Sequence, residues 1–126
     1  MIVLDASAML ALLFRETGHE RVATVLSQSC MSTVNLAEVI TRFARDGHDA
    51  QKVLQHINGS PVELVPFLAE DAALAAMLAP QVRNLGLSLG DRACLALAMV
   101  RDVPVYTADR MWETVDLGLT IELIRS

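Results

Sequence analysis

The distribution of apolar and polar residues along the chain has two alternating periods. Short apolar, partly β-branched runs predict strands at Ile2–Leu4, Cys30–Ser32, Val62–Val65, Val103–Thr107 and Leu119–Ile124. Longer segments with helical spacing predict helices from about Ala8, then at Gly18–Gln28, Asn35–Arg45, Asp49–Ile57, Glu70–Leu85, Gly90–Arg101 and Arg110–Val115. Pro80 should kink or divide the fifth of these helices. The alternation is typical of βαβ units, so we expect an α/β fold, a mostly parallel central sheet flanked by helices on both faces.

Size and composition limit the class of protein. The 126 residues suit one domain, 1–126, that can bury a core without disulfides. Hydrophobic residues make up 53% of the chain, yet the longest apolar run, Ala93–Val100, is far shorter than the roughly 20 residues of a membrane span. Asp5 interrupts the N-terminal apolar stretch, which argues against a signal peptide. The surplus apolar surface fits the two covered faces of a sheet or an oligomer interface.

Net charge and cysteine content further limit the class of protein. The formal net charge of −5 argues against a protein that coats nucleic acid non-specifically, unless several of the acids bind metal. Cys30 and Cys94 have no metal-type spacing, and Cys94 lies in an apolar helical run. A buried, reduced thiol is expected there, which is consistent with a cytoplasmic protein.

Four acidic residues occupy junctions between predicted elements. Asp5 directly follows the first strand and Asp109 follows the fourth, so both should project at the carboxyl edge of a parallel sheet. Asp91 opens an apolar helix, and Glu38 lies one turn into another helix, on the same face as Asn35. The fold therefore predicts that these acids meet at neighbouring corners.

Each acid also has an ordinary structural explanation. Asp5 and Asp109 can cap the helices that follow them. Ser88 and Asp91 match the capping-box spacing, and Glu38 can be a solvated helix residue. It is their joint placement that favours chemistry, because clustered carboxylates need protons or a cation among them. Mg²⁺ prefers oxygen ligands and can promote phosphodiester hydrolysis by activating water, without a nucleophilic side chain.

Four segments together resemble a known family. They are "VLDASAMLALL" (Val3–Leu13), "STVNLAEV" (Ser32–Val39), "LSLGDRACLALA" (Leu87–Ala98) and "VYTADRMW" (Val105–Trp112). In this order and at this chain length they resemble PIN-domain ribonucleases, and more narrowly the VapC-like toxins of type II (VapBC) toxin–antitoxin systems.

The resemblance implies an activity and a site. The implied activity is a Mg²⁺- or Mn²⁺-dependent endoribonuclease toxin that hydrolyses RNA phosphodiester bonds with metal-activated water. The implied catalytic and metal-binding set is Asp5, Glu38, Asp91 and Asp109, with Asp5 and Asp91 as the direct ligands. Supporting or substrate-binding positions are Ser7, Asn35, Thr107, Arg92 and Arg110. A cognate VapB-like antitoxin and a homodimer are the expected partners, with no membrane association.

Several alternatives stay open at this stage. Arg92 and Arg110 follow proposed ligands and suit phosphate contacts, but each can equally form a salt bridge with a neighbouring acid. A non-catalytic PIN-like module that binds RNA or protein would carry the same acids, and metal-dependent hydrolysis does not itself select RNA over DNA. Two other α/β classes fail on residues: a receiver domain needs a lysine after its last strand, and the only lysine is Lys52. A dehalogenase-type phosphatase needs Asp-x-Asp where this chain has Asp5-Ala6-Ser7.

Overall fold

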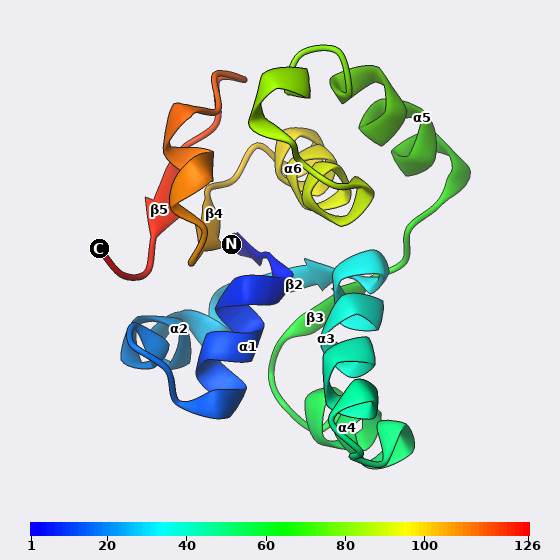
Figure 1. Cartoon of the computed structure of the whole chain (residues 1–126), viewed down its shortest axis with the longest axis vertical. Helices are drawn as coiled ribbons and strands as arrows, with labels where there is room; N and C mark the ends of the chain where they lie inside the picture. Colours follow the sequence, from blue (N-terminus) through cyan, green and yellow to red (C-terminus); the bar gives the residue numbers. More distant parts are fainter.

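A five-stranded sheet, entirely parallel and ordered β3-β2-β1-β4-β5, runs through the centre of the computed structural model, which describes residues 1–126 (Figure 1). The strands are β1 (Ile2–Leu4), β2 (Ser29–Ser32), β3 (Glu63–Val65), β4 (Val105–Thr107) and β5 (Ile121–Leu123). They are short, so side-chain packing on the two faces, more than the hydrogen-bond ladder, must hold the sheet together.

Helices cover both faces of this sheet. The six α-helices are α1 (Ala6–Phe14), α2 (His19–Val25), α3 (Thr33–Arg45), α4 (Ala50–Asn58), α5 (Ala69–Leu78) and α6 (Leu89–Arg101). Three 3₁₀ turns complete the chain: η1 (Leu26–Gln28), η2 (Arg83–Leu85) and η3 (Arg110–Thr114). In Figure 1, α1 to α4 lie below the sheet, and α5, α6 and η3 lie above it. The predicted fold class, helices on both faces of a parallel sheet, is confirmed.

The strands divide the core into two layers because successive side chains point to opposite faces. Leu4 and Met31 pack between the sheet and α1 to α4, whereas Val3 and Cys30 pack between the sheet and α5 and α6. Trp112, on η3, is fully buried in the second layer. Both cysteines are free and buried, which confirms the expectation for Cys94. No helix has the length and apolar character to span a bilayer.

Boundaries differ from the predicted ones mainly at helix starts and strand ends. The helix with Asp5 as its cap begins at Ala6 rather than near Ala8, and the last two strands are shorter than expected. The helix predicted across Pro80 ends at Leu78, so the proline divides it as anticipated. The segment after Asp109 is a 3₁₀ helix rather than an α-helix.

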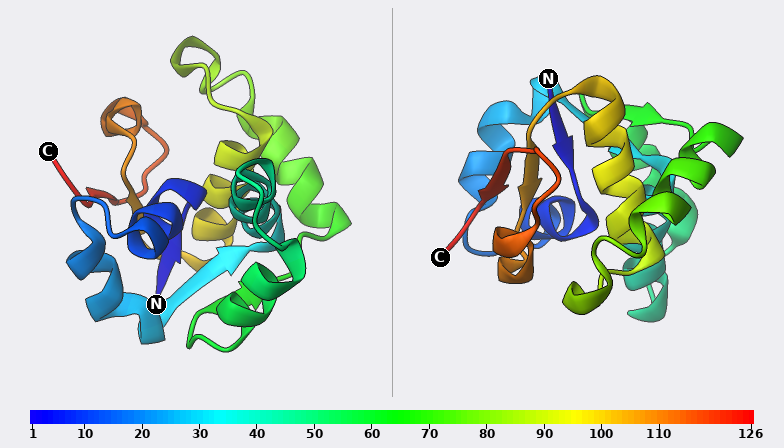
Figure 2. Two further views of the ribbon diagram at one scale, coloured as in Figure 1. Left: turned by 60° about the horizontal axis from the view of Figure 1, so that its bottom comes forward. Right: turned by 90° about the horizontal axis from the view of Figure 1, so that it is seen from above.

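The strand order places a topological switch point between β1 and β4. From β1 the chain proceeds outward to β2 and β3, then returns through α5 and α6 to β4 on the other side of β1. Helix α6 packs across β1, β2 and β4 (Figure 2). In open parallel sheets, ligands bind beyond the carboxyl ends of the strands at such a point. Asp5 follows β1 and Asp109 follows β4, so both acids flank this crevice.

Candidate active site

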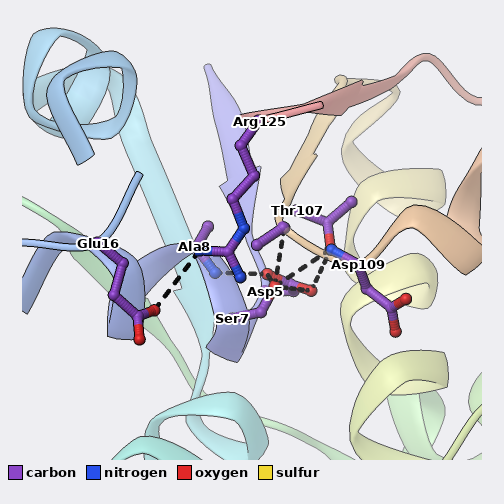
Figure 3. A network of polar contacts seen from close by, with 8 residues as sticks. Asp5, Ser7, Ala8, Glu16, Thr107, Asp109 and Arg125 are labelled. Carbon is purple, nitrogen blue, oxygen red and sulfur yellow. Dashed lines mark hydrogen bonds and ion pairs between the residues drawn. The ribbon is translucent and has the colours of Figure 1, made fainter. Parts of the chain in front are cut away.

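Asp5 lies at the centre of a buried hydrogen-bond network at the end of β1 (Figure 3). As the N-cap of α1 it accepts the backbone N–H of Ala8 at 2.8 Å. The Ser7 hydroxyl donates to both carboxylate oxygens, at 2.8 and 2.9 Å, and the Thr107 hydroxyl donates to Oδ2 at 2.6 Å. Capping therefore explains one of these contacts, and the hydroxyl contacts fix the orientation of the whole carboxylate.

Ser7 and Thr107 join the ends of β1 and β4. Ser7 Oγ accepts the N–H of Ala108 at 2.9 Å, and Thr107 Oγ1 accepts the N–H of Asp109 at 3.0 Å. Each hydroxyl thus donates to Asp5 and accepts from the β4 loop. These contacts hold the Asp5 carboxylate at the switch point.

Burial has a measurable electrostatic consequence for Asp5. Desolvation raises the pKa of its carboxyl from 3.8 to about 6, although the bonds from Thr107, Ala8 and Ser7 oppose the shift. The negative charge of Asp91 raises this pKa further. No Arg, Lys or His side chain forms an ion pair with Asp5, and Arg125 pairs with Glu16 at 3.6 Å instead (Figure 3). Asp5 is a buried acid without a counter-charge, an arrangement typical of functional sites.

Glu38 reaches the site from the first turns of α3. Asn35 Nδ2 donates to Glu38 Oε1 at 2.9 Å, as their shared helical face predicts, and to the carbonyl oxygen of Gly90 at 2.9 Å. The Glu38 carboxylate lies directly against Gly90, on α6. Partial desolvation raises its pKa, the Asn35 bond opposes this, and the charge of Asp91 adds to the rise.

The amide of Asn35 is buried, and its Oδ1 has no hydrogen-bond partner. Its orientation is dictated because both neighbours of Nδ2 are acceptors. An unsatisfied buried carbonyl costs about 1–3 kcal/mol, so the contacts of Nδ2 must outweigh that loss. The sequence pointed to the Asn35–Glu38 pair, but the contact of both residues with Gly90 was not predicted.

Asp91 is both a cap and a neighbour of the other acids. With Ser88 it forms a complete capping box: its N–H donates to Ser88 Oγ at 3.2 Å, and its Oδ2 accepts the Ser88 N–H at 3.0 Å. The capping explanation is therefore correct. It is incomplete, because the charge of Asp91 also raises the pKa of both Asp5 and Glu38.

The thiol of Cys94 lies near Asp5, Glu38 and Asp91, and its pKa reflects all three acids. This thiol is fully buried one turn after Gly90 and Asp91. Its pKa is raised well above the usual value, by burial first and then by electrostatic interaction with the nearby acids Asp5, Asp91 and Glu38. Asp91 lies in the first turn of α6, the Glu38 carboxylate lies against Gly90 in the same turn, and both acids and Asp5 act on this thiol.

Asp109 is the outer member of the set. Its Oδ1 accepts the N–H of Met111 at 2.9 Å and so caps η3, and its carboxylate points away from Asp5 in Figure 3. No three carboxylate, imidazole or thiol groups are placed as ready ligands of a single ion. The structure brings Asp5, Glu38 and Asp91 to one corner and leaves Asp109 at its edge.

The two arginines predicted to bind substrate are placed differently. Arg92 donates from Nη1 to the carbonyl oxygen of Ala75 at 2.8 Å, which ties α6 to α5. Arg110 is exposed and forms no ion pair. The salt-bridge alternative therefore applies to neither residue: Arg110 forms no ion pair, and Arg92 uses Nη1 for a backbone carbonyl oxygen.

Comparison with known proteins identifies the family. The PIN domain family matches residues 2–117, and the chain belongs to this family. A comparison with curated protein sequences gives no match.

Solved structures share the fold across nearly the whole chain. VapC20 of Mycobacterium tuberculosis, described as a sarcin-ricin loop cleaving toxin, has a TM-score of 0.78 at 19% identity, covering 95% of this chain and 97% of the other. VapBC2 of Rickettsia felis, solved bound to a promoter DNA fragment, has a TM-score of 0.73 at 17% identity, with 97% and 98% coverage. DNA-bound VapBC of Salmonella typhimurium has a TM-score of 0.71 at 21% identity, with 98% and 97% coverage.

Proposed function

We propose that this PIN domain is a divalent-metal-dependent endoribonuclease, the toxin of a type II toxin–antitoxin pair. The observation that carries the proposal is the buried, uncompensated Asp5 at the switch point, with Glu38 and Asp91 around the adjacent turn of α6. Such a group of carboxylates is unfavourable at neutral pH unless a cation joins it. Membership of the PIN family and the fold shared with VapC20 support the assignment to RNA cleavage.

The donor set fits Mg²⁺ or Mn²⁺. Mg²⁺ keeps several waters and needs only one or two carboxylates, so the absence of three converging ligands is compatible with it. We assign Asp5 and Asp91 as direct ligands: Asp5 is fixed by hydroxyls, and Asp91 uses only Oδ2 in its cap. Glu38 and the more distant Asp109 complete the acidic set, through water or in contact with the substrate. When bound, the cation supplies a Lewis acid for the phosphate and acidifies water.

The chain's own residues then position the reaction. Ser7 and Thr107 hold Asp5 in one orientation, which removes the entropy cost of ordering it on each turnover. The acids repel an RNA backbone wherever no cation is bound, so productive binding is coupled to metal loading. Without these acids the remainder of the chain is nearly neutral.

A surface groove of about 430 Å³ leads away from Glu38 along α3. Its lining residues are Val34, Ala37, Glu38, Thr41, Arg42 and Arg45. Arg42 is partly engaged by Asp46 at 3.4 Å, whereas Arg45 has no ion-pair partner. We propose that Arg45 and Arg110 contact RNA phosphates.

A second groove suits a VapB-like antitoxin, the partner present in several of the structures that share this fold. A cavity of about 470 Å³ between α1, α2 and α4 has an apolar floor that includes Met9, Leu12 and Ile57. It continues into a cavity of about 300 Å³ through Leu13 and His56. An amphipathic antitoxin segment would bury this floor on binding.

Homodimerisation is proposed from exposed apolar side chains outside that groove. Met77 on α5 is 68% exposed and Val100 on α6 is 65% exposed, and both lie in the layer above the sheet. Sedimentation equilibrium of the wild type and of Met77→Lys tests this: a dimer that dissociates in the variant supports an interface at α5. A monomeric wild type would contradict it. A cytoplasmic location follows from the proposed RNA substrate and partner.

The decisive experiment for the function compares wild type with Asp91→Asn, both purified free of antitoxin. Each is incubated with total RNA and with single- and double-stranded DNA in Mg²⁺, Mn²⁺ or EDTA. Metal-dependent RNA cleavage that is absent in the variant is the expected result. A folded wild type that neither binds metal nor cuts RNA would contradict the proposal and favour a non-catalytic PIN-like binding module, and cleavage of DNA alone would change the substrate class.

A further inference from the structure

The backbone conformation of Gly90 does not require glycine, but the space around it does. It lies in the first turn of α6, and its φ is not in the left-handed region that favours glycine. It is buried, in a helix otherwise rich in alanine and leucine. A helical glycine costs stability relative to alanine, so the missing side chain needs another explanation.

The carboxylate of Glu38 occupies the space that a side chain at residue 90 would fill. A Cβ placed on Gly90 would lie well within 3.0 Å of Cδ and both carboxylate oxygens of Glu38, a separation that real Cβ atoms do not reach. The three nearest atoms that such a Cβ would meet all belong to this one carboxyl group, at the end of a flexible side chain. The absent side chain at residue 90 therefore creates a seat for one carboxylate.

Asn35 holds the carboxylate in that seat from the other side. Its Nδ2 uses one hydrogen for Glu38 Oε1 and the other for the carbonyl oxygen of Gly90, both at 2.9 Å. The same amide thus ties the carboxylate and the seat to each other, across α3 and α6. Its Oδ1 stays unpartnered, as expected if this contact determines how the amide is oriented.

We propose that Gly90 and Asn35 are positioning residues that seat the Glu38 carboxylate beside Asp91 for metal binding. The inference rests on the proposed function, because the seat has a purpose only if Glu38 contributes to a metal site. It gives Gly90 a role at the site although this residue carries no acidic group. It also explains how an exposed helix residue such as Glu38 is kept in one place.

The test replaces Gly90 and leaves all four acids unchanged. In Gly90→Ala the new methyl group displaces the end of a flexible side chain, and the better helix propensity of alanine offsets the lost Asn35–Glu38 bond, so the protein should fold and melt within a few degrees of wild type. Mn²⁺ affinity, measured by electron paramagnetic resonance without RNA, should fall about 10- to 100-fold, the range for lost positioning partners of metal ligands. A crystal structure of the variant should show the Glu38 carboxylate moved away from α6.

Two controls separate positioning from general damage. Gly59→Ala makes the same exchange at the end of α4, where a Cβ meets only ordinary contacts at 3.4 Å, and should leave Mn²⁺ affinity unchanged. In a Glu38→Ala background there is no carboxylate to displace, so adding Gly90→Ala should change Mn²⁺ affinity less than twofold.

The outcomes distinguish this inference from the proposed function. A wild type that binds Mn²⁺ and cuts RNA, beside a Gly90→Ala protein of equal affinity or with Glu38 unmoved, would overturn the positioning role alone. An undiminished effect of Gly90→Ala in the Glu38→Ala background would overturn it too. A wild type that binds no Mn²⁺ would overturn the function and this inference together.

Discussion

Asp5→Asn should make the metal-free protein more stable at neutral pH while removing its metal binding. Asparagine has the same shape and is an equally good N-cap, so Oδ1 can still accept the Ala8 N–H. The new amide N–H group faces the hydroxyls of Ser7 and Thr107, which now donate to Asp5. Hydroxyls rotate and can accept instead, so the network stays satisfied without a buried charge.

The size of the effect follows from the pKa of Asp5. Its folded value of about 6 lies roughly two units above the unfolded value of 3.8, and one unit corresponds to about 1.4 kcal/mol. Because the folded state holds the proton more tightly, the stabilisation by the protonated carboxyl is complete below pH 4 and is lost as pH rises to 6 and beyond. At pH 7 the ionised carboxylate therefore costs the metal-free protein about 3 kcal/mol, which is the upper limit of the gain in Asp5→Asn.

Urea unfolding in EDTA between pH 4 and 8 measures this directly. The free energy of unfolding of wild type should decline through pH 4–6 relative to Asp5→Asn, and the difference between the two proteins isolates Asp5 from other titrating groups. Adding Mg²⁺ at pH 7 should stabilise wild type and leave the variant unchanged.

Two results would contradict a buried, uncompensated charge on Asp5. A variant less stable than wild type at pH 7 would mean that Asp5 is compensated in the fold and that its charge is not a liability. Equal stabilisation of both proteins by Mg²⁺ would mean that the cation binds elsewhere.

The other acids and hydroxyls give three further predictions. Thr107→Val removes a donor to Asp5 and the acceptor of the Asp109 N–H, so unfolding free energy should fall by about 1–3 kcal/mol in chemical denaturation, and cleavage should slow with it. Asp91→Asn keeps an oxygen for the Ser88 N–H, so its melting temperature should stay within a few degrees of wild type while RNA cleavage is lost; a large loss of stability would mean that the cap is its main role. Asp109→Asn should reduce the cleavage rate less than Asp91→Asn in the same assay, because this carboxylate points away from Asp5, and equal losses would place it among the ligands.

The sequence predicted the architecture because its signals are local. Apolar runs and helical spacing identify the helices and strands. Pro80 interrupts the helix it would lie in and Asp5 caps the helix that follows it, so both effects were predictable from neighbouring residues. The length of the last strands was not, since Val103 and Leu119 have strand-forming side chains but no partners in the ladder at those positions.

The sequence predicted which residues lie near the site but not how their side chains are oriented. Residues at strand ends must approach one another in a parallel sheet, so Asp5 and Asp109 could be placed at one edge from sequence. Which way each side chain points depends on competing local hydrogen-bond partners: the Asp109 carboxylate accepts the N–H of Met111 on η3, and Arg92 donates to a carbonyl oxygen of α5. The contact of Glu38 with Gly90 joins α3 to α6, and only a glycine at the start of an alanine-rich helix signalled it.

The most direct test of the central claim is a crystal structure of the wild type with Mn²⁺, located by anomalous diffraction. We expect a peak at the carboxyl ends of β1 and β4, with oxygens of Asp5 and Asp91 bonded to the ion. Density for Mn²⁺ at another site, or none at millimolar Mn²⁺, would contradict the assignment of these acids to a metal-dependent nuclease.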